Sequence, residues 1–248
     1  MTDAWNELAA HTLDIESVDP GRSVGWWAAA WALYLRHPLR WTLWAAVPMV
    51  ALALLARLPA VGPVAAALLS PLLLGGWMLA AQRADRGGPP VALDVLRTLR
   101  RDHVQPLLAL GALLAVATLV IELASHALGL AAHLGAVAVD GPADLAAQAA
   151  LGRGMLALLL LLVASLLVTA ALWFAPALVV LRGTPPRQAL LASLRAVLDN
   201  GLTFLLFAVV QLFLLAAVAA LPWQAGWLVL LPVMLLTGYV SYREVFDA

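Results

Sequence analysis

Six runs of mostly apolar residues, each near the length that a helix needs to cross a bilayer, constrain the fold of this chain more than any other feature. They occupy about residues 39–58, 61–82, 104–128, 155–181, 202–221 and 223–241. A transmembrane helix takes about 20 such residues because the hydrocarbon layer is roughly 30 Å thick. Charged side chains make up only 11% of the 248 residues, whereas they make up about a quarter of a soluble domain. The sequence therefore predicts an all-α membrane protein with six transmembrane helices.

The positions of the arginines indicate how the predicted spans are oriented. Twelve of the 14 lie near the termini, between spans two and three, or between spans four and five, which places them on one side of the membrane. Only Arg57 and Arg153 fall on the other side. Short cytoplasmic loops are enriched in basic residues, so we expect both termini in the cytoplasm. Residues 1–21 would then form an acidic cytoplasmic tail, and residues 22–248 a single six-span membrane domain.

A short motif recurs and indicates an internal repeat. Arg86, Gly87, Gly88, Pro89 and Pro90 reappear further along as Arg182, Gly183, Thr184, Pro185 and Pro186. Three Arg-bearing amphipathic stretches end at turn signals, namely His37 with Pro38, Asp102 with His103, and Asp199 with Asn200. We predict three units, about 22–88, 89–184 and 185–248, each an interfacial helix followed by a transmembrane hairpin. The alternative is that positive-inside sorting and Pro/Gly turn chemistry produce the likeness without any repeat.

Ionisable and polar residues inside the spans are the first candidates for a functional site. Glu122 and His126 lie one turn apart in span three, close to the outer interface. They could form a proton-linked site or, with His133 and Asp140, a metal site; the interpretation we favour is a structural carboxylate paired with Arg57. Gln211 lies near the middle of span five, where an interhelical hydrogen bond is its expected role. We expect no metal, no cofactor and no catalytic residue.

The function that these patterns favour is non-enzymatic. Hydrolase, protease and phosphate-loop motifs do not occur in the sequence, cysteine is absent, and the net charge of zero gives no argument for nucleic-acid binding. The basic cytoplasmic stretches are expected to meet anionic lipid headgroups or another envelope protein, through Arg97, Arg100, Arg101, Arg187 and Arg195. The alternative is a small-solute transporter or channel, for which the spans offer few polar residues.

The first 100 residues also resemble a known group of proteins. The run from Gly21 to Trp41 holds a Trp-rich helix followed by Arg36, His37, Pro38 and a further Trp. Span two carries Ser70, Pro71, Gly75 and Met78 and is followed by Arg83, Ala84, Asp85, Arg86 and Gly87. This region resembles a family of uncharacterised proteobacterial six-span inner-membrane proteins, most strongly over residues 21–100. The helix-plus-hairpin unit is more distantly similar to the membrane domains of some glycerophosphodiester phosphodiesterases. The resemblance implies a multi-pass protein of the bacterial inner membrane and supplies no catalytic residues.

Overall fold

The computed structural model describes residues 14–58, 61–91, 94, 97–137, 144–221 and 226–247. Within these ranges the regular elements are α-helices: α2 (Arg22–Arg36), α3 (Pro38–Ala56), α4 (Val61–Asp85), α6 (Arg101–Val137), α7 (Asp144–Trp173), α8 (Ala175–Arg182), α9 (Pro186–Asp199), α10 (Gly201–Ala219) and α11 (Trp227–Phe246). Six helical segments are long and apolar enough to cross a membrane, with α7 and α8 together making the fourth. The six apolar helices predicted from the sequence are confirmed.

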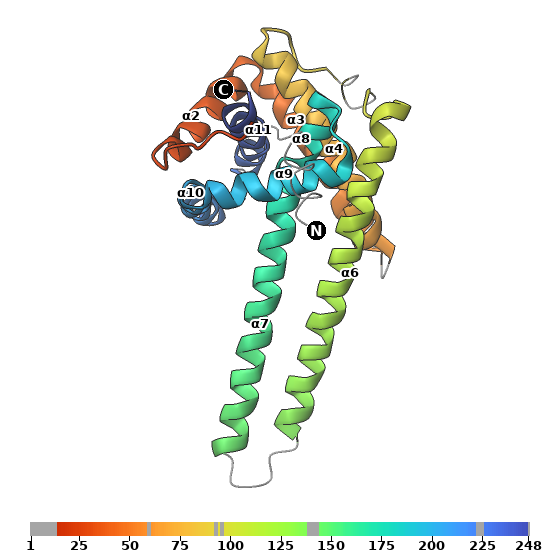
Figure 1. The fold of residues 1–248 in the computed structure, drawn as a ribbon, viewed down its shortest axis with the longest axis vertical. Coiled ribbons are helices and arrows are strands. Elements are labelled where there is room, and N and C mark those ends of the chain that lie inside the picture. Colours follow the sequence, from red (N-terminus) through yellow and green to blue (C-terminus); the bar gives the residue numbers. More distant parts are fainter. Residues whose placement is uncertain are drawn as a thin grey trace, which may run out of the picture.

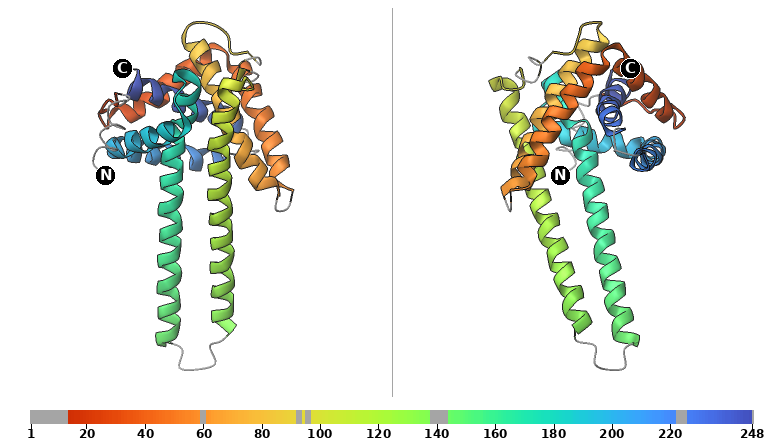
Figure 2. Two further views of the ribbon diagram at one scale, coloured as in Figure 1. Left: turned by 45° about the vertical axis from the view of Figure 1, so that its right-hand side comes forward. Right: turned by 180° about the vertical axis from the view of Figure 1, so that it is seen from behind.

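Helices α6 and α7 form a long antiparallel hairpin that projects from the rest of the molecule (Figures 1 and 2). The 37 residues of α6 correspond to about 55 Å at 1.5 Å per residue, more than a bilayer's hydrocarbon thickness. Most large apolar side chains of α7 between Met155 and Leu167 are exposed. Lipid is the environment that suits such a surface.

Helix α10 runs across the direction of this hairpin. It is seen end-on in Figure 1 and again from behind in Figure 2, in views where α6 and α7 lie lengthwise. The third predicted hairpin is therefore arranged differently from the second, and the apolar helices are not one parallel bundle. The change of direction falls at Asn200, the residue between α9 and α10.

The recurring Arg-Gly-x-Pro-Pro motif is a helix stop. Gly87 and Gly183 both adopt positive φ angles, 87° and 68°, which glycine tolerates best. The Gly87 N–H donates to Ala84 O at 3.1 Å, and the Gly88 N–H donates to Arg83 O at 3.0 Å, as in a Schellman cap. The Gly183 N–H similarly donates to Val179 O at 3.1 Å. Capping chemistry therefore explains the likeness of the two copies.

The segments that follow the two copies end differently. Helix α9, which opens the predicted third unit, starts at Pro186 and runs to Asp199, next to α10. After the first copy, Asp94 and Arg97 are the helical residues that the structure describes, residues 98–100 form turns and a bend, and α6 starts at Arg101. The predicted break at Asp102 and His103 is wrong, because both residues lie inside α6. The breaks at His37 with Pro38 and at Asp199 with Asn200 are confirmed. The structure does not confirm the threefold repeat.

An aromatic cluster joins helix α2 to the C-terminal half of the chain. Its rings come from α2 (Trp26 and Trp27), the α7–α8 junction (Trp173 and Phe174), α10 (Phe204 and Phe207) and α11 (Phe246). Helix α2 buries residues at helical spacing, among them Ser23, Trp26, Ala30 and Leu33. This face packs against α10 and α11, so segments far apart in sequence share one core.

The segment before α2 is tied to the same core. The Val18 N–H donates to Asn200 Oδ1 at 2.7 Å, and Asn200 Nδ2 donates to Glu16 O at 3.2 Å. Thr203 Oγ1 donates to Val18 O at 2.9 Å, and the Glu16 N–H donates to Val245 O at 2.9 Å. The described end of the predicted acidic tail therefore packs against the α9–α10 turn and α11.

A buried serine marks the kink between α7 and α8. Ser193 of α9 accepts a hydrogen bond from the Phe174 N–H at 2.9 Å and donates to Ala170 O at 2.7 Å. The amide of Phe174 and the carbonyl of Ala170 would bond each other in an uninterrupted helix. The hydroxyl inserted between them accounts for the kink, together with Pro176 in the first turn of α8.

Candidate functional site

The predicted intramembrane candidates do not form one site in the described part of the chain. Glu122 and Arg57 make no ion pair there, and Arg57 is exposed after the end of α3. The physical reason is that α6 packs mainly on α4, and α3 packs on α4 as well. The predicted pairing of Arg57 with Glu122 therefore does not occur among the described residues.

The remaining polar candidates are separate from one another. His126 is exposed on α6, and Gln211 is half-buried on α10. Neither side chain makes a hydrogen bond to any described residue. The side chains of His133 and Asp140, named for a metal site, lie outside the described residues.

The arginines predicted to meet lipid divide into two kinds. Arg97 is paired with Asp94 at 3.0 Å. Arg100, Arg187 and Arg195 are exposed, and within the described residues none has a carboxylate partner. The side chain of Arg101 lies outside the described ones.

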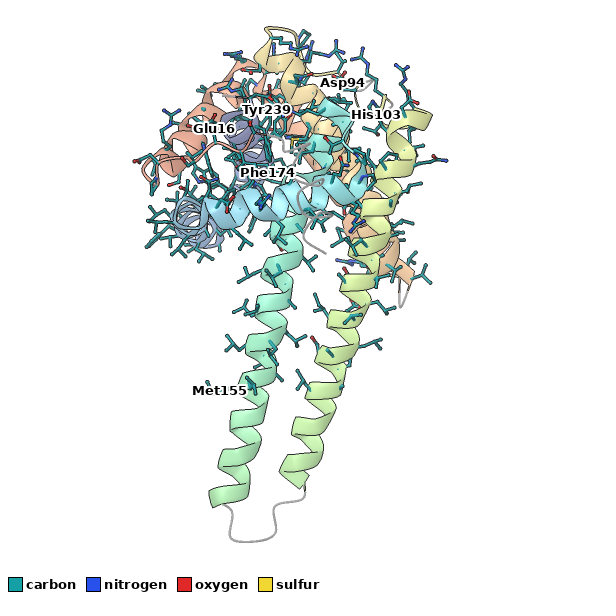
Figure 3. All side chains as sticks on the ribbon, viewed as in Figure 1. Glu16, Asp94, His103, Met155, Phe174 and Tyr239 are labelled. Atoms are coloured by element: carbon teal, nitrogen blue, oxygen red, sulfur yellow. The ribbon has the colours of Figure 1, made fainter. Side chains whose placement is uncertain are left out.

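Within the described residues, carboxylates that the sequence analysis did not single out hold four of the other arginines. Asp94, labelled in Figure 3, is fully buried. Arg83 donates to it from Nε at 3.1 and 3.0 Å and from Nη2 at 2.8 Å. Arg97 supplies one more hydrogen bond, at 3.0 Å. Two partly exposed guanidiniums thereby compensate one buried negative charge.

A second set of ion pairs joins the C-terminal end of α11 to α2, α4 and α8. Asp85 accepts from Arg243 Nη1 at 2.7 Å and from the Tyr239 hydroxyl at 3.1 Å. The other pairs are Arg22 with Glu244, which also accepts from Trp26 Nε1, and Arg182 with Asp247. The signal available in the sequence was that acidic residues accompany arginines at the helix ends, in Arg83-Ala84-Asp85-Arg86 and Arg243-Glu244.

A groove between α2 and α11 lies beside these ion pairs. Its volume is about 360 Å³, and it is lined by Arg22, Gly25, Ala29, Val240, Arg243, Glu244 and Asp247. The lining combines two guanidiniums, two carboxylates and small or apolar residues. It is the candidate ligand site of the described molecule.

The apolar helices and the charged ends define a class, the multi-pass α-helical membrane proteins. The chain belongs to the family described as "Domain of unknown function (DUF7847)", which it matches over residues 24–245. This membership supports the predicted resemblance to an uncharacterised family. Neither the comparison with curated proteins nor the comparison with solved structures found a match.

Proposed function

We propose that the protein is a non-enzymatic component of the bacterial inner membrane whose cytoplasmic face binds anionic lipid headgroups. The observation that carries the proposal is the contrast among its arginines. Arg100, Arg187 and Arg195 are exposed without a carboxylate partner among the described residues, whereas Arg83 and Arg182 are paired. Each basic side chain near an anionic membrane surface contributes about 1 kcal/mol of attraction.

Helix α9 exposes two of these arginines, Arg187 and Arg195, away from the side that packs on the protein. Its buried residues, Ala189, Ser193 and Ala196, follow a helical spacing and define the side that packs on the protein. Arg187 and Arg195 lie off this stripe and are exposed. A helix packed on one side and basic on the other can rest on a charged bilayer surface.

Replacing Arg187 and Arg195 together with glutamine is expected to weaken binding to anionic lipid. Two lost contributions of about 1 kcal/mol each correspond to a roughly 30-fold lower affinity. The measurement is the rise in melting temperature when phosphatidylglycerol, rather than phosphatidylcholine, is added to the purified full-length protein in detergent. The rise in melting temperature should become smaller as salt is added, because mobile ions screen exposed charges.

The matched control is Arg57→Gln, which removes an arginine that is also exposed but is predicted to lie on the other side of the membrane. It should leave the phosphatidylglycerol effect unchanged. Equal stabilisation of the wild-type protein by both lipids would contradict the proposal.

The proposed orientation places both termini in the cytoplasm. Reporter fusions after residues 88, 184 and 248 should show cytoplasmic activity, and a fusion after residue 140 should show periplasmic activity. The reason is the unequal distribution of arginine between the two sides. Periplasmic activity at 88, 184 or 248 would overturn this topology.

A further inference from the structure

We propose that the groove between α2 and α11 binds a phosphoethanolamine group, carried by a zwitterionic phospholipid or free in solution. This site uses none of Arg100, Arg187 and Arg195, so it goes beyond the anionic-lipid role proposed above. The inference rests on the space in the groove, the unused donors on its walls and the balance of its charges.

The groove has room for a ligand. Its volume of about 360 Å³ falls within the range of roughly 300–1,000 Å³ that is typical of small-molecule sites. Gly25 forms part of the lining, and a Cβ added there would meet no atom within 4 Å. Ala29, one turn further along α2, is a second small residue of the lining and leaves the groove open on the same face of the helix.

Two guanidiniums on the walls keep unused hydrogen-bond donors. Arg22 contacts Glu244 through Nε, and Arg243 contacts Asp85 through Nη1. A guanidinium has five N–H donors, so each side chain retains several. The two side chains are 65% and 45% exposed. Guanidinium groups bind phosphate well because their N–H groups match two phosphate oxygens at once.

The carboxylates provide the complementary half of the site. Both oxygens of Glu244 are occupied, one by Arg22 and one by Trp26. Asp247 accepts from Arg182 through Oδ1 and also interacts with the Tyr242 hydroxyl. Its side chain is still 38% exposed, so the carboxylate can also accept from an ammonium group. The four charged side chains of the lining sum to zero, which matches a zwitterion better than a ligand with a net negative charge.

The surroundings of the groove favour a ligand delivered by the membrane. Val24, Trp31 and Leu35 of α2 are large apolar residues exposed at the surface. Tryptophan is enriched where a protein meets the headgroup level of a bilayer. A headgroup in the groove could therefore keep its acyl chains beside α2.

The test is native mass spectrometry of the full-length protein released from detergent with added phosphatidylethanolamine, phosphatidylcholine or phosphatidylglycerol. Phosphatidylethanolamine should bind about tenfold more tightly than the other two, a difference of about 1.4 kcal/mol. The trimethylammonium of phosphatidylcholine has no N–H to donate to Asp247, and phosphatidylglycerol lacks the positive charge. Asp247→Asn should abolish the preference for phosphatidylethanolamine over phosphatidylcholine.

Gly25→Leu fills the groove and should lower phosphatidylethanolamine binding at least about tenfold, equivalent to about 1.4 kcal/mol. Gly129→Leu is the matched control, since Gly129 is also helical with no atom near its added Cβ, and it should bind normally. Competition by free glycerophosphoethanolamine assigns the site to a soluble ligand, and lack of competition assigns it to the lipid. Equal binding of the three lipids by the wild-type protein, or full binding by Gly25→Leu, would overturn the proposal.

Discussion

Replacing Gly111 with alanine is expected to lower the free energy of unfolding by about 3 kcal/mol, the upper end of the usual range for overpacked cores. A Cβ at this position would lie 2.1 Å from the carbonyl oxygen of Leu68 and 2.8 Å from its carbonyl carbon. These are backbone atoms of α4, so no side-chain rotation relieves the clash and the two helices have to separate. Leu107 and Leu110 of α6, which are fully buried, would lose part of their packing.

Thermal unfolding of the purified protein in detergent, followed by tryptophan fluorescence, measures this effect. Gly129→Ala is the control in the same helix, because no atom lies within 4 Å of its added Cβ. That variant should match the wild type or gain up to about 1 kcal/mol, the difference in helix propensity between glycine and alanine. If Gly111→Ala melted like Gly129→Ala, the close approach of α4 and α6 would be wrong.

Replacing Arg83 with glutamine is expected to cost about 3 kcal/mol, the low end for removing one partner of a buried ion pair. Asp94 is fully buried and receives three of its hydrogen bonds from Arg83 but one from the Arg97 side chain. Without Arg83 the carboxylate stays buried with much less compensation. Denaturation of the purified variant against the wild type gives the difference.

Two further variants show whether the buried charge of Asp94 causes the loss of stability in Arg83→Gln. Arg97→Gln should cost clearly less than Arg83→Gln, because Arg97 makes a single contact with Asp94 and is 47% exposed. Combining Arg83→Gln with Asp94→Asn should recover part of the loss, because no unpaired charge is then buried. A double variant less stable than Arg83→Gln alone would count against this account.

The apolar spans could be predicted because their signal is local. A lipid-facing helix needs an uninterrupted apolar run. The run at about 104–128 lies inside α6, and the run at about 202–221 matches α10 except for its last two residues. Gly111 and Ala115 also have the small-residue spacing that is typical of close helix contacts, and α4 makes such a contact at Gly111. The direction of α10 could not be predicted, because it depends on tertiary hydrogen bonds between Asn200 and residues 16 and 18.

The partners of the charged residues were the part that sequence reasoning missed. Counting arginines gave their distribution between the two sides but not their carboxylate neighbours, since Arg22 and Glu244 lie at opposite ends of the chain. The predicted pairing of Arg57 with Glu122 assumed that similar depth implies contact. Two residues at a similar depth in the membrane can still lie on helices that do not pack together. Helix α6 packs mainly on α4, where a contact with α3 was expected.

The aromatic contact between α2 and α10 has a consequence for the order in which the fold is completed during synthesis. About 180 residues separate Trp26 from Phe204. A ribosome adding about 5–20 residues per second takes roughly 10–40 s to make that stretch. During this interval the aromatic face of α2 lacks its partners from α10 and α11, and the bilayer interface is the surface that can shelter it. Helix α2, although made early, is thus among the last to reach its final neighbours.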